Sequence, residues 1–196
     1  IWDVTAGGTS PTVKLNNAVI GGVVELAAGT ADDDVAHMFA VNHPFVLDAA
    51  SARQIWFETR LRLSDVDASG FFAGIAGNGT SATVDTSIMA GGLADGIGWQ
   101  VLDGQAAVTL ATITAVGDAE TVTQSSTSVE DATFVTLAFH FDGTTAHFYI
   151  NGALSHSSAS NLPADGTLIC PHIEMIQQTG DSDTLQVDYV NYCMER

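Results

Sequence analysis

The sequence contains very few basic residues. Only 5 of its 196 residues are Lys or Arg, against 23 Asp and Glu, and the formal net charge at pH 7 is −18. Proteins that bind nucleic acid through its phosphates need clustered Lys and Arg, so this composition argues against a nucleic-acid partner. The acidity itself has two interpretations: binding of Ca²⁺ or a basic partner, or solubility in a saline setting or at high local concentration.

Long apolar runs and cysteine are also scarce. No apolar stretch approaches the roughly 20 residues of a membrane-spanning helix, so we expect no membrane segment. Residues 1–10 lack the basic and apolar regions of a signal peptide, and the chain does not start with Met. Two cysteines are too few for a disulfide framework. We predict that Cys170 and Cys193 are free, buried thiols, although they could pair if the last two strands were neighbours.

The most informative stretch is 134–157, FVTLAFHFDGTTAHFYINGALSHS. Apolar residues alternate along 135–141, which is the period of a half-buried strand. The segment DGTT at 142–145 forms a turn. Asn151-Gly152 favours a type I′ hairpin turn, because both central residues of that turn need positive φ. The stretch therefore predicts three consecutive antiparallel strands.

The loop lengths in this stretch fix a register. The four-residue loop pairs Phe139 with Phe148. It also pairs His140 with His147, and the two-residue loop then pairs His147 with His156. Three imidazoles in a row could bind Zn²⁺, but strands lie about 4.8 Å apart, so the outer two would be roughly 10 Å from each other. We expect exposed or interface-packed histidines, with weak binding by a pair or a pH response near about 6.5 as alternatives.

The whole chain predicts an all-β protein. Residues 54–63 (QIWFETRLRL) alternate clearly, and 71–76 (FFAGIA) indicate a buried strand. Only 48–52 could form a single helical turn, and 125–131 are expected to be a loop. About ten short strands without a linker predict one domain over residues 1–196. Its expected fold is an antiparallel two-sheet β-sandwich, preferably a jelly roll.

These motifs resemble a known family. FHFDGTTAHFYINGALSHS, then NLPADGTL and LQVDYVNYCMER, resemble concanavalin A-like (laminin G/lectin-type) jelly rolls. The upstream block FETRLRLSDVDASGFFAGIAG looks like the version in structural proteins of tailed bacteriophages. The resemblance covers roughly residues 54–196. It implies virion surface proteins, capsid decoration or cement subunits, or glycan-binding modules. The carboxylates that glycosidase members carry at alternate positions of their catalytic strand have no counterpart here.

Several acidic turns are candidate Ca²⁺ ligands. Asp65 and Asp67 fit the first half of a calcium loop, D-x-D-x-S-G, but position 12 of that loop falls on Ala76. A turn capped by Asp side chains is the preferred interpretation. Asp181 and Asp183 in TGDSDT form a similar acidic turn. We expect no cofactor, with Ca²⁺ as the alternative.

Catalytic and glycan-binding groups give weaker signals. Glycoside hydrolysis needs two acids about 5–9.5 Å apart, and no acidic pair stands out, although His172 and Glu174 share a face of one strand. We therefore expect no enzyme. Glycan binding needs aromatic rings on an open face, for which Trp56, Trp99 and Tyr149 are the candidates.

The first functional hypothesis is a non-enzymatic virion protein. A capsid decoration or cement subunit would dock on the major capsid protein or other virion proteins, as a homo-oligomer on the particle surface, and would stabilise the assembled shell. Its predicted anchor is Arg53, Arg60 and Arg62 with Trp56, because Arg is favoured at interfaces. The second hypothesis is a lectin-like module that recognises surface glycans through loop acids, Ca²⁺ and an exposed aromatic ring.

Overall fold

The structure consists of β-strands joined by turns and loops. This computed structural model describes residues 2–7, 12–16, 22–31, 34–40, 45–47, 53–77, 94–101, 109–117, 119–177 and 183–195. Every regular element within these ranges is a strand. Within the same ranges, no helix has the length and apolarity needed to cross a membrane.

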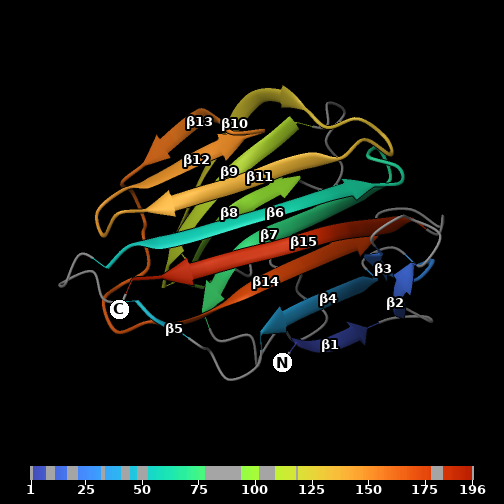
Figure 1. Ribbon diagram of the computed structural model, residues 1–196, viewed down its shortest axis with the longest axis horizontal. Helices are drawn as coiled ribbons and strands as arrows, with labels where there is room; N and C mark the ends of the chain where they lie inside the picture. Colours follow the sequence, from blue (N-terminus) through green and yellow to red (C-terminus); the bar gives the residue numbers. More distant parts are fainter. Residues whose placement is uncertain are drawn as a thin grey trace.

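The strands form two antiparallel sheets that lie face to face (Figure 1). Sheet A has eight strands, in the order β1-β4-β14-β7-β8-β9-β10 with β5 paired to β14, and sheet B has seven, in the order β13-β12-β11-β6-β15-β3-β2. The bounds are β1 (Trp2–Gly7), β2 (Thr12–Asn16), β3 (Val23–Ala27), β4 (Val35–Ala40), β5 (Phe45–Val46), β6 (Ile55–Leu63), β7 (Ser69–Gly77), β8 (Gly96–Val101), β9 (Thr109–Val116), β10 (Ala119–Ser128), β11 (Val135–Phe141), β12 (Ala146–Ile150), β13 (Ala153–Ser158), β14 (Leu168–Gln177) and β15 (Thr184–Met194). The predicted all-β, two-sheet jelly-roll sandwich is confirmed.

The core lies between the sheets and centres on aromatic rings. Alternate residues of β6 and β11 point inward, as their sequence period predicts. Phe57, Phe139 and Phe148 form a row across β6, β11 and β12, with ring centroids 5.4 and 6.0 Å apart. From sheet A, Trp99 meets Phe148 edge-on at 5.4 Å, and its indole Nε1 donates a hydrogen bond to the backbone oxygen of Ala138 at 3.0 Å. Trp99 therefore joins the two sheets.

Sheet A is buried on both faces. Phe71 belongs to the main core, whereas its neighbour Phe72 points the other way into a second apolar cluster with members from β4, β9 and β14. Strands β7 and β8 pair closely here. A Cβ on Gly74 would collide with the backbone oxygen of Ile97, and a Cβ on Gly98 would lie 2.7 Å from the Phe72 ring. The continuous apolar run at 71–76 is thus a two-sided buried strand, as predicted.

The predicted meander is confirmed in its first two strands. Phe139 pairs with Phe148 and His140 pairs with His147. Asn151 and Gly152 have φ values of 49° and 81°, as the type I′ turn requires. The third member of the predicted histidine row is wrong. An irregularity between Phe148 and Tyr149 shifts the register by one residue.

The shift changes the partners of the third strand. His147 pairs with Ser157, whereas His156 pairs with Phe148 and stacks on that ring at 6.4 Å. A β-bulge inserts one residue into a strand, and loop length alone cannot reveal it. The three histidines therefore do not form one row.

Two further expectations are corrected. Residues 125–128 are the end of strand β10, not a loop, while 48–52 lie outside the described residues. Neither Cys170 nor Cys193 forms a disulfide, as predicted, but only Cys170 is buried and Cys193 is exposed. The last two strands belong to different sheets, so Cys170 and Cys193 lie in different layers.

The contrast between two tryptophans tests this architecture. Trp99 is fully buried, whereas Trp56 is 47% exposed. We expect Trp99→Ala to lower the free energy of unfolding by about 3–5 kcal/mol, because it opens a cavity between the sheets. Trp56→Ala, the matched control, should cost only about 0.5–1.5 kcal/mol, the contribution of a surface ring stack. Urea unfolding measures both values, and equal losses would contradict the placement of Trp99.

Candidate functional site

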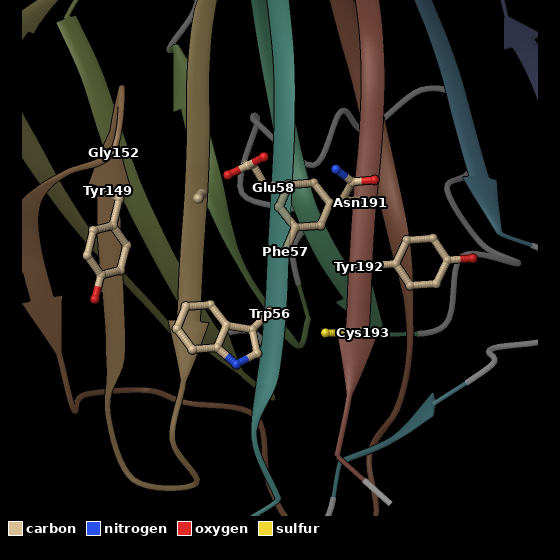
Figure 2. Close-up of a pocket in the computed structure, with 9 residues that line it drawn as sticks. Trp56, Phe57, Glu58, Tyr149, Gly152, Asn191, Tyr192 and Cys193 are labelled. Carbon is tan, nitrogen blue, oxygen red and sulfur yellow. The ribbon is translucent and has the colours of Figure 1, made fainter.

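An open hollow of about 460 Å³ lies on the outer face of sheet B, the face that points away from sheet A (Figure 2). Its size falls within the range of about 300–1,000 Å³ that is typical of ligand pockets. Strands β6, β11, β12 and β15 supply its lining, together with Gly152 from the turn that follows β12. The residues are Trp56, Phe57, Glu58, Ala138, Tyr149, Gly152, Asn191, Tyr192 and Cys193.

The hollow exists because a small residue lies between large ones. Asn191, Glu58, Ala138 and Tyr149 are consecutive cross-strand partners over β15, β6, β11 and β12. Neighbouring strands are about 4.8 Å apart, so Glu58 and Tyr149 flank the position where Ala138 contributes only a methyl group. Trp56 is the next outward residue on β6 and borders the same hollow. In Figure 2 the Trp56 indole extends from β6 over strand β11, and the Tyr149 ring extends from the next strand, β12.

Trp56 forms a supported aromatic platform. Its cross-strand partner His140 stacks on it in parallel, with 3.8 Å between ring centroids and 12° between planes. The opposite position on β15 is Cys193. His140 Nε2 is 2.9 Å from Gln54 Oε1, which fixes the imidazole. Burial, and then the nearby His147, hold the pKa of His140 below its ordinary value. The neutral imidazole of His140 covers one face of the Trp56 indole and leaves the rest of the indole towards solvent.

The polar lining includes the carboxylate of Glu58 and the amide of Asn191. Glu58 Oε1 accepts a hydrogen bond from the Tyr189 hydroxyl at 2.9 Å. Burial raises the pKa of Tyr189, and the bond to Glu58 raises it further. Asn191 is exposed beside them. Because a carboxylate has about four lone-pair sites, Glu58 keeps acceptor capacity for a ligand hydroxyl.

The structure brings together two of the three predicted glycan-binding aromatics. Trp56 and Tyr149 both face outward, as their strand positions predict, and both line the hollow. Trp99 is a correction. Its side chain is fully buried between the sheets and cannot be presented on an open face. Alternation does not reveal this, because β8 is buried on both faces.

Two residues of the predicted arginine anchor, Arg60 and Arg62, are engaged in contacts with strand β15 and with the loop before β11. Arg60 forms an ion pair with Asp188 at 2.6 Å. Arg62 donates to Gln186 Oε1 and to the backbone oxygen of Ala132. Both guanidinium groups also lie over the Phe134 ring, at 4.2 and 4.5 Å. Arg53 is only partly exposed, in the residues that precede β6.

The predicted acidic turns have structural roles where they are described. Asp65 Oδ1 accepts the backbone N–H of Asp67 at 2.9 Å, which is the expected side-chain cap of a turn. Asp183 is buried rather than an exposed turn acid, and its carboxylate binds Gln177 Nε2 at 2.9 Å and Ser64 Oγ at 3.1 Å. Asp181 lies outside the described residues. Calcium binding by these acids stays a prediction.

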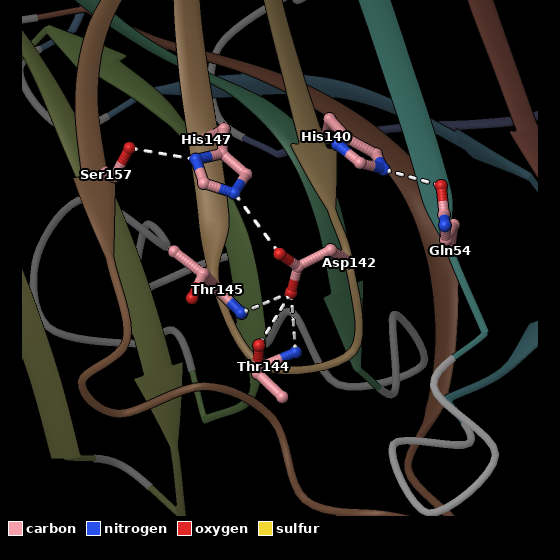
Figure 3. A network of polar contacts seen from close by, with 7 residues as sticks. All are labelled: Gln54, His140, Asp142, Thr144, Thr145, His147 and Ser157. Carbon is pink, nitrogen blue, oxygen red and sulfur yellow. Dashed lines mark hydrogen bonds and ion pairs between the residues drawn. The ribbon is translucent and has the colours of Figure 1, made fainter.

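A Ser–His–Asp network, which the sequence analysis did not predict, occurs at the β11–β12 turn (Figure 3). His147 Nδ1 is 2.9 Å from Ser157 Oγ, and His147 Nε2 is 3.3 Å from Asp142 Oδ2. The other oxygen of Asp142 accepts bonds from the backbone N–H and hydroxyl of Thr144 and from the Thr145 N–H. The contacts of Asp142 with Thr144 and Thr145 cap the loop after β11. The contacts of His147 with Asp142 and Ser157 connect this loop to β12 and β13. The bulge that displaces His156 is what brings Ser157 to His147.

A family model matches the central part of this chain. Residues 75–169 match the family model described as the Concanavalin A-like lectin/glucanases superfamily. This match agrees with the two-sheet sandwich and with the family that the sequence motifs resemble. Among proteins with curated functions, none matches this sequence.

Solved structures extend the likeness to nearly the whole chain. A protein of unknown function from Shewanella oneidensis MR-1 is 12% identical over 97% of this chain and 77% of that chain, with a TM-score of 0.65. The carbohydrate recognition domain of Emp46p, in a potassium-bound form, is 9% identical over 97% and 87%, with a TM-score of 0.67. A family 7 alginate lyase in complex with substrate is 11% identical over 96% and 84%, with a TM-score of 0.62. At these identities the likeness establishes the fold alone.

The Asp142 cap yields a stability prediction. Hydrogen bonds from Thr144, then from Thr145 and His147, hold the pKa of Asp142 well below its ordinary value of 3.8. Asp142→Ala should lower the free energy of unfolding by about 1–3 kcal/mol, the range for hydrogen bonds to a charged group. A carboxyl group whose pKa is lowered by folding stabilises the fold at pH values above its unfolded pKa. The difference in unfolding free energy between wild type and Asp142→Ala should therefore shrink as the pH falls below 3.8. Urea unfolding from pH 7 to pH 3 measures it. Asp65→Ala, which removes a single capping bond, is the control and should cost less.

The Trp56–His140 stack yields a pH prediction. Because the folded pKa of His140 lies below 6.5, the unfolded chain binds more protons just below that pH, and this residue makes stability fall as the pH drops. Trp56→Ala should raise the pKa of His140 towards 6.5 by exposing one ring face to water. An NMR titration of the imidazole carbon signals measures the change. Tyr149→Phe should leave it where it is, and an unchanged pKa in Trp56→Ala would contradict the role of the stack.

Proposed function

We propose that this chain is a non-enzymatic, lectin-like carbohydrate-binding domain whose ligand occupies the hollow on the outer face of sheet B. The observation that carries the proposal is the platform of Trp56, which is backed by His140 at 3.8 Å and lines the hollow together with Tyr149 and Ala138. The likeness in fold to carbohydrate recognition domains supports it.

The chemistry of the hollow suits a sugar ring. One face of a pyranose is rich in C–H groups and packs against an indole or phenol ring, while its hydroxyls need fixed hydrogen-bond partners. Trp56 supplies the exposed ring, at 47% exposure. Glu58 and Asn191 line the same hollow and offer an acceptor and an amide for hydroxyl groups.

Charge favours neutral over acidic glycans. The chain carries a net charge of −18, and Glu58 lines the hollow itself. The basic side chain that follows Glu58 on the same face, Arg60, is ion-paired with Asp188. An anionic sugar would meet like charge here, so electrostatic complementarity selects neutral hexoses or their N-acetyl derivatives.

Binding without catalysis is the preferred version of this function. Glycoside hydrolysis uses two carboxylic acids about 5–9.5 Å apart. Among the described residues that line the hollow, Glu58 is the single carboxylate, and it is held by Tyr189. Alginate lyases occur among the structural neighbours, so the fold itself is compatible with enzymes and the distinction depends on the site.

The virion-subunit function stays a prediction, together with its capsid partner, its oligomeric state and its place on the particle surface. Two of its proposed anchor residues, Arg60 and Arg62, use their guanidinium groups for contacts within sheet B. Trp56, the fourth proposed anchor residue, is better explained by the hollow that it borders. The open aromatic site therefore favours glycan binding over docking through the arginines.

A glycan array followed by calorimetry tests the proposed function. We expect wild-type protein to bind neutral glycans. Trp56→Ala should weaken the affinity about tenfold or more, since an anchoring aromatic ring contributes on the order of 1.4 kcal/mol or more. Ala138→Leu should also abolish binding, because its side chain fills the hollow. Leu15→Ala is the control, since Leu15 is 69% exposed on β2, at the far edge of the same sheet.

The array also separates the alternatives. Parallel wells with calcium and with chelator test the predicted Ca²⁺ requirement independently of the aromatic site. Circular dichroism of each variant verifies that it is folded. An array without any hit, or hits that survive both Trp56→Ala and Ala138→Leu in folded protein, would overturn the proposal.

A further inference from the structure

Three metal-ligand side chains converge on the outer face of sheet A, the face that points away from sheet B. His37 lies on β4, and His172 and Glu174 lie two residues apart on the neighbouring strand β14. His37 and Glu174 are direct cross-strand partners. One ligand atom from each side chain lies within 4.8 Å of the other two, and this is the one such group found among the described His, Cys, Asp and Glu residues.

Strand geometry brings three ligands towards one point here, which the predicted row of three surface histidines would not do. Cross-strand neighbours are about 4.8 Å apart and residues two apart on one strand about 6.6 Å, so three such side chains can lean towards one point. A predicted row over three strands spreads its outer members to roughly 10 Å. The difference lies in the placement of two ligands on the same strand.

All three side chains are buried. Their exposed fractions are 2% for His37, 1% for His172 and 1% for Glu174. Apolar rings surround them: Phe39 stacks on His172 at 5.9 Å, and Phe72 meets it edge-on at 6.0 Å. Two imidazoles and a carboxylate in such surroundings are costly unless they are paired or coordinate a metal.

His172 lacks a hydrogen-bond partner that would account for its burial. Neither its Nδ1 nor its Nε2 makes a hydrogen bond. Its Nε2 is 3.5 Å from Glu174 Oε2, and its ring centroid is 5.4 Å from that of His37. Buried polar atoms without a partner are rare in native proteins, and a bound ion is one of the recognised explanations.

We propose that His37, His172 and Glu174 bind one transition-metal ion of the zinc class. Two imidazole nitrogens and one carboxylate oxygen suit Zn²⁺, Co²⁺ or Ni²⁺, whereas Ca²⁺ and Mg²⁺ prefer all-oxygen sites. Ligands at about 2.0–2.1 Å in a tetrahedron are about 3.4 Å apart, so the side chains need to close from 4.8 Å. Three protein ligands leave a fourth position for water or a ligand group.

This site is independent of the proposed glycan function. It lies on sheet A, whereas the hollow lies on the outer face of sheet B and involves β6, β11, β12 and β15. A metal in this position would cross-link β4 and β14, in addition to their backbone ladder and the ring contacts of His172. It would therefore stabilise the fold, because a metal that binds only the folded chain shifts the unfolding equilibrium towards the folded state.

Cobalt spectroscopy tests the site directly. The full chain is unfolded in urea with a chelator, refolded without metal, and refolded again with Co²⁺, so that burial does not limit access. We expect one equivalent of Co²⁺ with the visible absorption of a four-coordinate ion, displaced by one equivalent of Zn²⁺. The thermal midpoint should rise with Zn²⁺ concentration. Less than a tenth of an equivalent bound after gel filtration, measured by elemental analysis, would overturn the proposal.

Matched variants locate the ion. His172→Gln and Glu174→Gln should each weaken Co²⁺ affinity at least tenfold while preserving side-chain size. His147→Gln is the control, because His147 and His140 form a surface pair with rings 6.0 Å apart that could bind metal adventitiously. Loss of the cobalt spectrum in His147→Gln, or its retention in both sheet A variants, would contradict the assignment. If His172→Gln does not fold, Glu174→Gln and the wild-type thermal shift decide the outcome.

Discussion

The hydrogen bond from the Trp99 indole to the backbone oxygen of Ala138 is the contact on which the two layers of the domain depend. It is 3.0 Å long and joins β8 of one sheet to β11 of the other, in the middle of a core that contains Phe139 and Phe148. A buried indole N–H needs a partner, so this bond fixes the lateral position of the sheets as well as their separation. Residue 138 therefore connects the core to the outer surface: its oxygen faces Trp99, and its methyl group is the floor of the hollow.

The hollow follows from that arrangement together with residue size. Strand β11 alternates large inward residues with small or polar outward ones, and its central outward residue is an alanine. Rings on β6 and β12 then lie on both sides of an unfilled position. His140 packs beneath Trp56 and prefers to be neutral because it is partly buried. The Trp56 indole is therefore both held in place and open to solvent. A site that recognises an amphipathic sugar ring needs both properties.

The two sheets have different chemical characters. The outer face of sheet B carries charged and aromatic groups that are paired with one another but remain accessible, as the contacts of Arg60 and Glu58 illustrate. The outer face of sheet A is buried, with Phe72 in an apolar cluster and His172 and Glu174 among aromatic rings. The accessible polar groups of sheet B are available for binding a ligand. The buried polar groups of sheet A need partners inside the protein, because burying them without a partner costs free energy.

The sequence by itself determined the local features that have a short-range physical cause. The two-residue period of β6 and β11 placed Trp56 outward, and the four-residue loop at 142–145 set the hairpin with Phe139 opposite Phe148. Only the tertiary structure decided three other features. The bulge after Phe148 moved His156 out of register, because an extra residue in a strand has no loop-length signature. Trp99 is buried because β8 is covered on both faces, a state in which alternation carries no information. The hollow and the His37–Glu174 pair each unite strands from opposite ends of the chain, and such long-range neighbours depend on sheet order rather than on local pattern.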